Sequence, residues 1–362
     1  MTNDPFSSIY QRLTQLTLAS SSPTSGAFSE IALDLFQLQF EQVTPYKQYC
    51  LALHHTPNSV REITDIPPLP TSAFKEFQLT SLPPSEHHHV FRSSGTTSSE
   101  TSQHFHSHSS LAHYQSLVLP WFKYHLLHDL PHITFLNLMP DSQQAPHSSL
   151  AAMMESAIRN FGTPDSQSLG SVDPNHLWHL NPTQITRSLQ NQCNAGEPCL
   201  VSGTAFGFVE LLDHLANNQI RLTLPNGSRV METGGYKGRT RQLPKASLHS
   251  LITRHLGVPP SHIVSEYGMC ELSSQAYDRI VGTTSPRQFR FPPWCHARLV
   301  EPGTNQPPAP GDPGLITLLD LANVRSIMSI QTGDLGIGNA NGFEILGRAT
   351  GTINRGCSLL QS

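Results

Sequence analysis

Apolar residues recur along the chain with two spacings, and the pattern changes near Val90. Two stretches near the N-terminus, 7–19 and 28–42, carry apolar residues at helical spacing, which predicts two amphipathic helices. Beyond Val90, short apolar runs that end in Gly or Ser alternate with helical periods. We therefore predict strands at 132–139, 198–203, 228–234, 262–268 and 314–321, and helices at 109–127, 148–161 and 208–217. Strands that alternate with helices are typical of an α/β fold with a mostly parallel sheet, in which ligands bind at the loops after the strands.

A proline-rich segment, DIPPLPTSAF (65–74), separates the helical N-terminus from the alternating part. Because proline restricts its own backbone and that of the residue before it, we expect this segment to be extended.

The composition indicates a globular protein with few charges. Charged residues make up 13% of the 362 residues and the net charge is −4, which gives no electrostatic footprint for nucleic acid or an anionic membrane. There is no run of 18 apolar residues and no basic region before an apolar stretch at the N-terminus. We therefore expect no membrane span, no signal peptide and a cytoplasmic location. The six cysteines lack CxxC pairs, so neither a disulfide scaffold nor a zinc ribbon is predicted.

Histidine is concentrated in one part of the chain, between His87 and His147, and includes the runs HHH (87–89) and HFHSH (104–108). A zinc or nickel site is one interpretation of these runs. They lack cysteine or carboxylate partners at ligand spacing, so a polar surface on a charge-poor protein is the favoured interpretation.

Five short segments are candidates for chemistry; the first is rich in hydroxyls and the second in glycine. FRSSGTTSSETS (91–102) combines hydroxyls with backbone N–H groups that can surround phosphate oxygens. It lacks the lysine of a Walker loop, and a plain linker is the alternative. In METGGYKGR (231–239), Gly234 and Gly235 let the backbone approach a flat ligand, while Lys237 and Arg239 add positive charge. An ordinary hairpin turn is the alternative there.

The other three segments lie further along the chain, and we expect each of them at a loop. In SEYGMCELSSQAYD (265–278), Tyr267 can stack on an aromatic base and Glu271 can hold a divalent cation. In TGDLG (332–336), Gly333 frees a turn and Asp334 can accept hydrogen bonds from a ribose diol. The last segment, GRATGTINRGCSLLQS (347–362), begins near Arg348 and contains Cys357.

In this order, the segments resemble the signature motifs of the adenylate-forming superfamily, the acyl- and aryl-CoA synthetases and their relatives. The versions present here are SSGTT, TGG, YGMCE, TGD and GR. A finer resemblance is to the LuxE-type acyl-protein synthetases. It rests on ETGGYKGR, SEYGMCELSSQ and RGCSL, on LNLMPDSQQAPHSSLAAMM (136–154), and on LPTSAFKEF (69–77).

The resemblance implies an α/β adenylate-forming fold with parallel or mixed sheets flanked by helices for residues 1–349. This core comprises a helical N-terminal part (1–80) and an ATP- and acyl-binding part (81–349), followed by a tail (350–362). Other members of the superfamily continue past the GR hinge into a small lid domain with a catalytic lysine. No lysine follows Arg348 in this sequence, so we expect the lid to be absent.

The resemblance also implies ATP and Mg²⁺ as cofactors and assigns a role to each motif. The β- and γ-phosphates would be held by Ser93, Ser94, Gly95, Thr96 and Thr97. Adenine would be enclosed by Gly234, Gly235, Tyr267 and Gly268. Glu271 would act in catalysis by binding Mg²⁺, and Asp334 and Arg348 would hold the ribose hydroxyls.

The activity implied is activation of a carboxylic acid, of the long-chain fatty class, as an acyl-adenylate. The acyl group would then pass to the chain's own Cys357, whose neighbour Arg355 favours the thiolate. A partner reductase would receive it. One departure is Cys270, which stands where the superfamily usually has a threonine, and a thiol is a weaker hydrogen-bond partner.

Two other functions stay open on the sequence alone. The chain could activate a different carboxylic acid for a carrier-protein or CoA thiol. It could also be a non-catalytic subunit of an acyl-reductase complex. Cys270 favours this function, and so does the hinge segment GRATGTI (347–353), which has no acid or lysine at the usual hinge positions.

Overall fold

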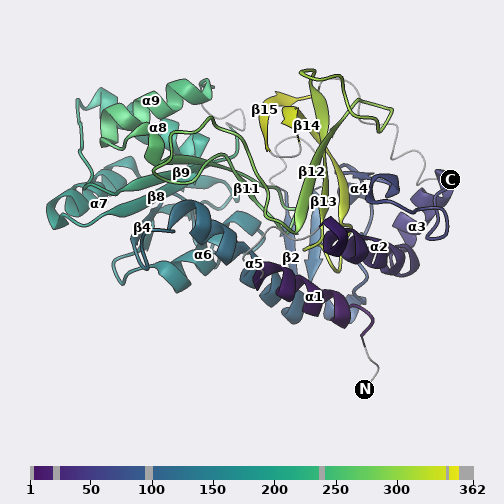
Figure 1. The fold of residues 1–362 in the computed structure, drawn as a ribbon. Helices are drawn as coiled ribbons and strands as arrows, with labels where there is room; N and C mark the ends of the chain where they lie inside the picture. Colours follow the sequence, from purple (N-terminus) through teal and green to yellow (C-terminus); the bar gives the residue numbers. More distant parts are fainter. Residues whose placement is uncertain (1–3, 19–24, 94–100, 236–240, 340–341, 350–362) are drawn as a thin grey trace. The chain divides into compact units, whose positions relative to one another are not determined.

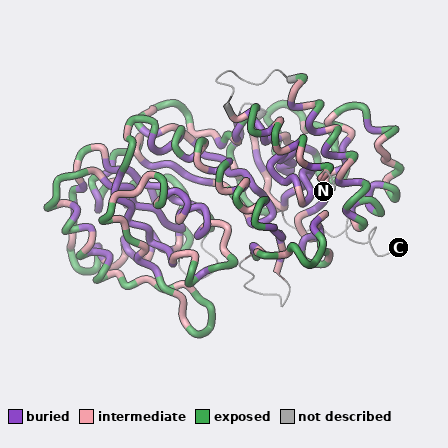
Figure 2. The backbone as a smooth tube through the Cα atoms, turned by 90° about the horizontal axis from the view of Figure 1, so that it is seen from below, coloured by how far each residue is buried: buried purple, intermediate pink, exposed green. Residues whose placement is uncertain are grey.

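The computed structural model describes residues 4–18, 25–93, 101–235, 241–339 and 342–349. The chain divides into two compact units (Figure 1). The first unit consists of Met1–Val118, Met269–Gln275 and Gln288–Ser362, and the second of Leu119–Gly268 and Ala276–Arg287. Buried residues run along the strands, while exposed ones gather in loops and on outer helix faces (Figure 2).

The second unit is built on a six-stranded sheet with the order β11-β10-β9-β8-β4-β5. Its strands are β4 Thr134–Asn137, β5 Gln167–Ser168, β8 Cys199–Thr204, β9 Arg229–Thr233, β10 Ile263–Tyr267 and β11 Ala276–Tyr277. All neighbours pair in parallel except β10 and β11. A separate hairpin joins β6 Gly170–Val172 to β7 Trp178–Leu180.

Helices cover both faces of this sheet. Figure 1 shows α8 (Ala205–Asn217) and α9 (Lys245–Leu256) on one face and α6 (Ser149–Phe161) on the other. A row of residues in register across four strands, Leu136, Val201, Val230 and Ile263, lies in one buried cluster with side chains of α7 (Pro182–Ala195), α8 and α9. Burial on both faces explains why the strands are apolar without alternation.

The first unit contains a five-stranded sheet with the order β1-β14-β13-β12, in which β15 also pairs with β14. Its strands are β1 Leu69–Pro70, β12 Cys295–Val300, β13 Gly314–Asp320, β14 Ser329–Asn339 and β15 Gly342–Arg348. Only β1 and β14 pair in parallel. The strand predicted at 314–321 therefore exists as β13, but in an antiparallel sheet rather than in the parallel one.

Helices from the N-terminal part of the chain pack in the first unit. They are α1 Ser7–Leu18, α2 Ser25–Gln42, α3 Thr44–Ala52, α4 Ala73–Glu76 and the start of α5 His108–Leu126, with short 3₁₀ turns at Ile63–Asp65, Pro84–Glu86 and, in the second unit, Pro260–His262. Buried Gln39 on α2 donates to the carbonyl of Asn323 (2.8 Å) and accepts from the N–H of Met328 (3.0 Å). This amide fixes α2 against the connection between β13 and β14.

A two-stranded hairpin, β2 His89–Arg92 and β3 Gln103–His106, completes the first unit. The extended segment predicted at 65–74 is shorter than expected, because a 3₁₀ turn ends at Asp65 and α4 begins at Ala73. Only β1 within it is a strand.

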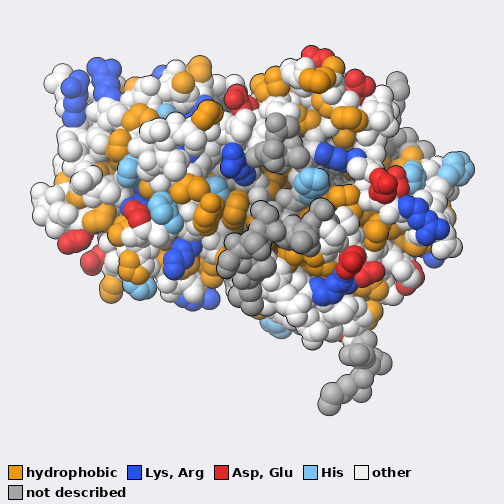
Figure 3. All heavy atoms as spheres, in the orientation of Figure 1, with side chains coloured by type: hydrophobic (Ala, Val, Ile, Leu, Met, Phe, Trp, Pro, Cys, Tyr) orange, Lys and Arg blue, Asp and Glu red, His pale blue; other side chains and the backbone are white. Residues whose placement is uncertain are grey.

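Charged side chains occur singly or in small groups on the face drawn in Figure 3. Among the described helices, none is both long and apolar enough to cross a membrane.

Candidate functional site

The segment 269–275 in the first unit carries Glu271 and is held by three buried side chains. His104, on β3, places its Nδ1 2.9 Å from the carbonyl of Cys270. Asn323 donates from Nδ2 to the carbonyl of Glu271 (2.8 Å). Asp320, at the end of β13, accepts from the backbone N–H groups of Ser273 and Ser274, both at 2.9 Å. Three separate elements thus fix the backbone on both sides of Glu271.

The predicted phosphate loop starts from the β2–β3 hairpin, and its base is closed by two serines. Ser93 donates its N–H to the carbonyl of Ser102 (3.1 Å), and Ser102 donates its N–H to the Ser93 hydroxyl (3.0 Å). The Cys270 thiol lies 4.0 Å from the carbonyl of Ser102. Ser93 is therefore near the Glu271 segment, whereas Ser94, Gly95, Thr96 and Thr97 lie outside the described residues.

Cys270 and Glu271 interact directly. The Cys270 thiol donates to Glu271 Oε2 at 3.2 Å. Burial, together with the neighbouring carboxylate, raises the pKa of Cys270 well above its usual value, so the thiol keeps its proton. Among the described residues, no group of three His, Cys, Asp or Glu side chains could hold a metal alone. Mg²⁺ is usually held by one or two carboxylates together with phosphate and water oxygens, so Glu271 fits the predicted ion as a single ligand.

The TGD and GR segments lie in strands, not in the loops predicted for them. Asp334 on β14 and Arg348 on β15 are register partners, and Arg348 Nε lies 3.4 Å from Asp334 Oδ1. The pairing of β13 with β14 shifts register opposite Thr332–Asp334, so the ladder is irregular at the TGD segment. The structure thus brings the two residues together on one hairpin, with 86% of the Arg348 side chain exposed.

The TGG segment of the second unit follows the carboxyl end of β9. The alternative of a hairpin turn is wrong, because β9 pairs in parallel with both β8 and β10 and the next described element is α9. Gly234 has a φ of +68°, which favours glycine. A Cβ built on Gly234 or Gly235 would meet none of the described atoms within 4 Å, which fits a backbone that faces a flat ligand. Lys237 and Arg239 lie outside the described residues.

Tyr267 is the last residue of the neighbouring strand β10, and Gly268 follows it. Thr233 and Glu266 are register partners, so the TGG and YG segments leave the sheet side by side. Below them, the Thr233 hydroxyl donates to Glu266 Oε2. Burial raises the pKa of Glu266 to about 7, and the nearby Glu232 carboxylate adds to the rise.

Glu232 belongs to a second buried hydrogen-bond group. Its Oε1 accepts from the Ser265 hydroxyl (2.5 Å) and lies 3.2 Å from His249 Nε2. These bonds join β9, β10 and α9 just before the glycines.

The predicted residues therefore gather within each unit. Ser93 and Glu271, and separately Asp334 and Arg348, come together in the first unit, while Gly234, Gly235, Tyr267 and Gly268 share one sheet edge in the second. Cys357 lies outside the described residues. Sequence reasoning missed His104, Asp320 and Asn323, which hold the Glu271 segment. The spacing of His104 and His106 was a signal that both lie on one face of a strand, and β3 is buried from His104 to His106.

Comparison with known proteins identifies similar chains over nearly the whole length. A family model described as "Acyl-protein synthetase, LuxE" matches residues 16–362. A long-chain-fatty-acid–luciferin-component ligase of Aliivibrio fischeri is 22% identical over 324 residues, which cover 85% of this chain and 78% of the relative. A protein of the same name from Vibrio harveyi is 24% identical over 352 residues, covering 92% and 87%.

Among solved structures, the chain is similar to a 2-hydroxyisobutyryl-CoA ligase. An open conformation in complex with 2-HIB-AMP and CoA matches with a TM-score of 0.62 and 13% identity, covering 91% of this chain and 79% of that one. The same ligase in the thioesterification state matches with a TM-score of 0.64 and 14% identity, covering 92% and 70%. The likeness shows the fold, and the predicted α/β adenylate-forming fold is confirmed.

Proposed function

Because the chain belongs to the LuxE acyl-protein synthetase family, we propose that it activates a long-chain fatty acid with ATP and then carries the acyl group on Cys357. The chain is a ligase, as its motifs predicted. The fatty-acid class of the substrate comes from the names of its relatives.

In the first step, a carboxylate oxygen of the acid attacks the α-phosphorus of ATP, and pyrophosphate leaves. Gly234 and Gly235 would face adenine, and Asp334 and Arg348 would hold the ribose hydroxyls. Two observations support this. No described atom lies within 4 Å of a Cβ built on either glycine, and Asp334 and Arg348 form an ion pair across one hairpin.

Charge develops on the phosphates during this step and must be stabilised by groups already in position. Glu271 would hold Mg²⁺ against the phosphate oxygens, next to the loop that starts at Ser93. His104, Asp320 and Asn323 support this role by fixing the backbone of the Glu271 segment. Mg²⁺ would supply charge neutralisation.

In the second step, the Cys357 thiolate attacks the acyl carbonyl carbon, the bond to the phosphate oxygen breaks, and AMP leaves. The observation that carries this assignment is the state of the other thiols. Burial raises the pKa of every described cysteine: Cys50, Cys193, Cys199, Cys270 and Cys295. A thiolate is the nucleophilic form, so these five are poor acyl acceptors at neutral pH.

A thioester keeps the acyl carbonyl reactive toward a further acceptor. We propose that an acyl-reductase protein reacts with this thioester. Its hydride donor would add hydride to the carbonyl carbon, and the Cys357 thiolate would leave. The relatives' names, which couple a fatty acid to a luciferin component, support this class of partner.

The test is intact mass spectrometry of the full chain after incubation with ATP, Mg²⁺ and tetradecanoic acid. We expect one acyl adduct that neutral hydroxylamine removes, as it does thioesters, and that Cys357→Ser abolishes. Cys193→Ser is the matched control, because Cys193 is the described thiol that is only half-buried, and it should keep the adduct.

Two results would overturn parts of the proposal. An adduct that survives Cys357→Ser would place the acceptor elsewhere in the chain. Pyrophosphate release without any adduct would favour transfer to a thiol outside this chain, such as that of CoA or a carrier protein.

A further inference from the structure

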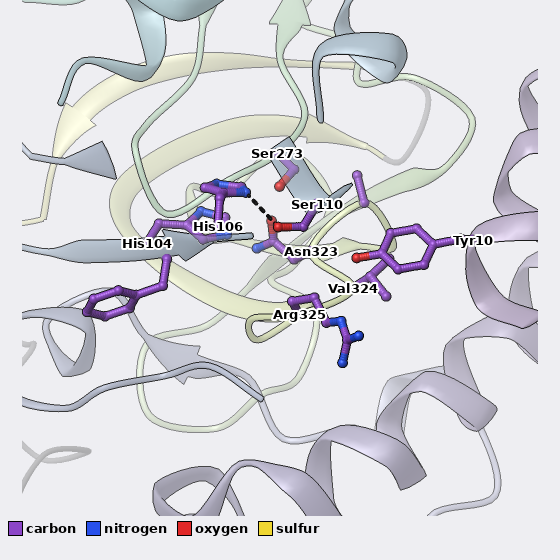
Figure 4. Close-up of a pocket in the computed structure, with 10 residues that line it drawn as sticks. Tyr10, His104, His106, Ser110, Ser273, Asn323, Val324 and Arg325 are labelled. Carbon is purple, nitrogen blue, oxygen red and sulfur yellow. Dashed lines mark hydrogen bonds between the residues drawn. The ribbon is translucent and has the colours of Figure 1, made fainter. Parts of the chain in front are cut away.

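A small pocket in the first unit is lined by two of the residues that hold the Glu271 segment, His104 and Asn323 (Figure 4). Its volume is about 10 Å³, which is close to the smallest space that holds one water molecule. The pocket is therefore too small for a metabolite. A buried polar group in the second unit has a clearer connection to ligand binding.

The carboxylate of Glu232 is the centre of this group and joins three elements. Its Oε1 accepts from Ser265 Oγ (2.5 Å) and lies 3.2 Å from His249 Nε2. A carboxylate only accepts hydrogen bonds, so His249 donates from Nε2 whether its ring is neutral or charged. All three residues are buried, and a buried carboxylate that loses a donor is strongly disfavoured. His249 and Ser265 therefore hold Glu232 in one orientation.

The group lies just before the segments that would enclose adenine. Glu232 on β9 and Ser265 on β10 are register partners. Side chains two positions apart on a strand leave the same face of the sheet, so Ser265 and Tyr267 share a face. Gly234 follows Glu232 at the same interval on the neighbouring strand. The bond between Glu232 and Ser265 thus ties the two strands together next to Gly234 and Tyr267.

Helix α9 is attached to these strands at two positions one helical turn apart. The first is the bond from His249 to Glu232. The second is Lys245, whose Nζ lies 3.8 Å from Oδ2 of the buried Asp278. Asp278 in turn accepts from the Ser265 N–H at Oδ1 (2.8 Å) and donates its own N–H to the Ser265 carbonyl (3.0 Å). The helix therefore holds β9 and β10 in a fixed relation.

We propose that His249 is a positioning residue for the nucleobase of ATP. By holding Glu232, it sets the separation between the Gly234 backbone and Tyr267, the two sides between which adenine would lie. The inference rests on the proposed function, which assigns adenine to these segments. Because His249 acts through Glu232, it contributes to nucleotide affinity and leaves the chemical step unchanged.

Loss of the His249 donor should weaken ATP binding by the full-length protein. His249→Leu removes the N–H group, and we expect the Kd of ATP with Mg²⁺, measured by titration calorimetry, to rise about fivefold. His249→Gln, whose amide nitrogen can take the place of Nε2, should restore the affinity. An unchanged Kd in His249→Leu would overturn the proposal. Equal weakening in both variants would contradict a role for the Nε2 donor.

Exchange kinetics separate positioning of the base from a general loss of structure. In acid-dependent exchange between ATP and pyrophosphate, His249→Leu should raise the KM for ATP. The kcat and the KM for pyrophosphate, which has no nucleobase, should stay at the wild-type values. If His249 only stabilised the fold, these constants would change together, and that result would overturn the proposal.

His255→Leu is the matched control. His255 is also buried on α9, and its Nδ1 lies 3.2 Å from the carbonyl of Ile220. That contact is near the other end of the helix from Lys245. His255→Leu should lower the melting temperature as His249→Leu does, but leave the Kd of ATP unchanged. An equal rise of Kd in both variants would show that ATP affinity follows the stability of the helix.

Ser265→Ala tests the group through the other donor to Glu232. We expect it to raise the Kd of ATP, and its effect and that of His249→Leu should combine less than additively, because both act on one carboxylate. Additive effects would contradict a shared path. A wild-type protein that binds no ATP would overturn the proposed function together with this inference, whereas equal binding by wild type and His249→Leu would overturn this inference alone.

Discussion

At the residue scale, two of the motif side chains have opposite environments. Arg348 is mostly exposed and pairs with Asp334, while Glu266 is fully enclosed beneath the glycine segment. Exposed ion pairs add little to stability because water screens them. Buried carboxylates, in contrast, couple their protonation to folding. We therefore expect substitution of Arg348 to change ATP binding and substitution of Glu266 to change the pH dependence of stability.

Arg348→Ala should change binding without changing stability. The exposed pair with Asp334 contributes little, so the melting temperature should stay within about 1 °C of the wild type. If Arg348 holds the ribose, the KM for ATP in acid-dependent pyrophosphate exchange should rise roughly tenfold, as expected for one lost charge-assisted hydrogen bond. Arg159→Ala is the control, because Arg159 is also exposed and also forms an ion pair, with Glu155 at 3.0 Å. Equal KM values for ATP in both variants would show that Arg348 does not hold the ribose.

Glu266→Gln should flatten part of the pH dependence of stability. The folded pKa of Glu266 is raised from 4.5 to about 7, so the folded state binds the extra proton between these values. Wild-type stability therefore falls as the pH rises through this window and stays lower above it. The neutral amide of the Glu266→Gln variant does not ionise, so the variant does not lose stability in this way.

The gain should be measurable by urea unfolding. Relative to the wild type, the free energy of unfolding of Glu266→Gln should increase by up to about 3 kcal/mol between about pH 5 and about pH 8. Glu197→Gln, at an exposed position, should show no such change. A pH-independent difference for Glu266→Gln would mean that Glu266 ionises normally in the folded protein.

At the element scale, the carboxyl end of β9 offers a matched pair of glycines. Gly234→Ala places a side chain at φ +68°, which should cost about 1–2 kcal/mol of folding free energy. Gly235 has no left-handed backbone, and a Cβ built on it would meet none of the described atoms within 4 Å, so Gly235→Ala should leave stability nearly unchanged. If adenine lies against this backbone, the added methyl should instead raise the KM for ATP. Thermal melts and exchange kinetics on both variants separate the two effects, and a Gly235→Ala enzyme with wild-type KM would argue against an adenine wall here.

The elements that the sequence predicted well are those with strong local signals. The strands expected at 132–139, 198–203, 228–234 and 262–268 appear as β4, β8, β9 and β10 within two residues at each end. Their apolar runs are continuous because both faces are buried. The helix at 148–161 is α6, which begins after the capping hydroxyl of Ser148.

Other elements carried weaker signals or were decided by distant contacts. Helix α7 has an Asn181 cap, a proline at its first position, a left-handed Gly196 at its end, and buried Ile185 and Leu189 at helical spacing. These signals were present in the sequence, but the helix was not predicted. The TGD and GR segments were expected in loops, because glycine usually marks turns. Their strands are stabilised by cross-strand pairing, which no local pattern reports.

In the candidate site, too, residues with a local sequence signal were predicted and residues that act through distant contacts were not. The motif residues were found from their order along the chain, without knowledge of any contact. His104, Asp320 and Asn323 were not found, because each acts on residues 47 to 166 positions away or through a backbone carbonyl. Such support depends on tertiary packing alone.

At the scale of the whole molecule, the distribution of cysteines predicts a thiol count. Four of the six cysteines, Cys50, Cys199, Cys270 and Cys295, are buried, and burial blocks both reagent access and thiolate formation. We expect at most two thiols to react with a disulfide reagent in the native protein and six after unfolding in urea. Cys193→Ser should lower the native count by no more than one and the unfolded count from six to five. Three or more fast thiols in the native state would contradict the packing of the core.

The pairing of β1 with β14 has a consequence for how the chain is made on the ribosome. Leu69 and Ile330 are register partners, so a segment from the first fifth of the chain receives its neighbour only when synthesis is almost complete. The six-stranded sheet, by contrast, has all of its strands once residue 277 has been added. During elongation, the apolar faces of the N-terminal helices therefore stay exposed until the strands of their sheet have been synthesised. Nascent chains with exposed apolar surface are the ones that chaperones protect.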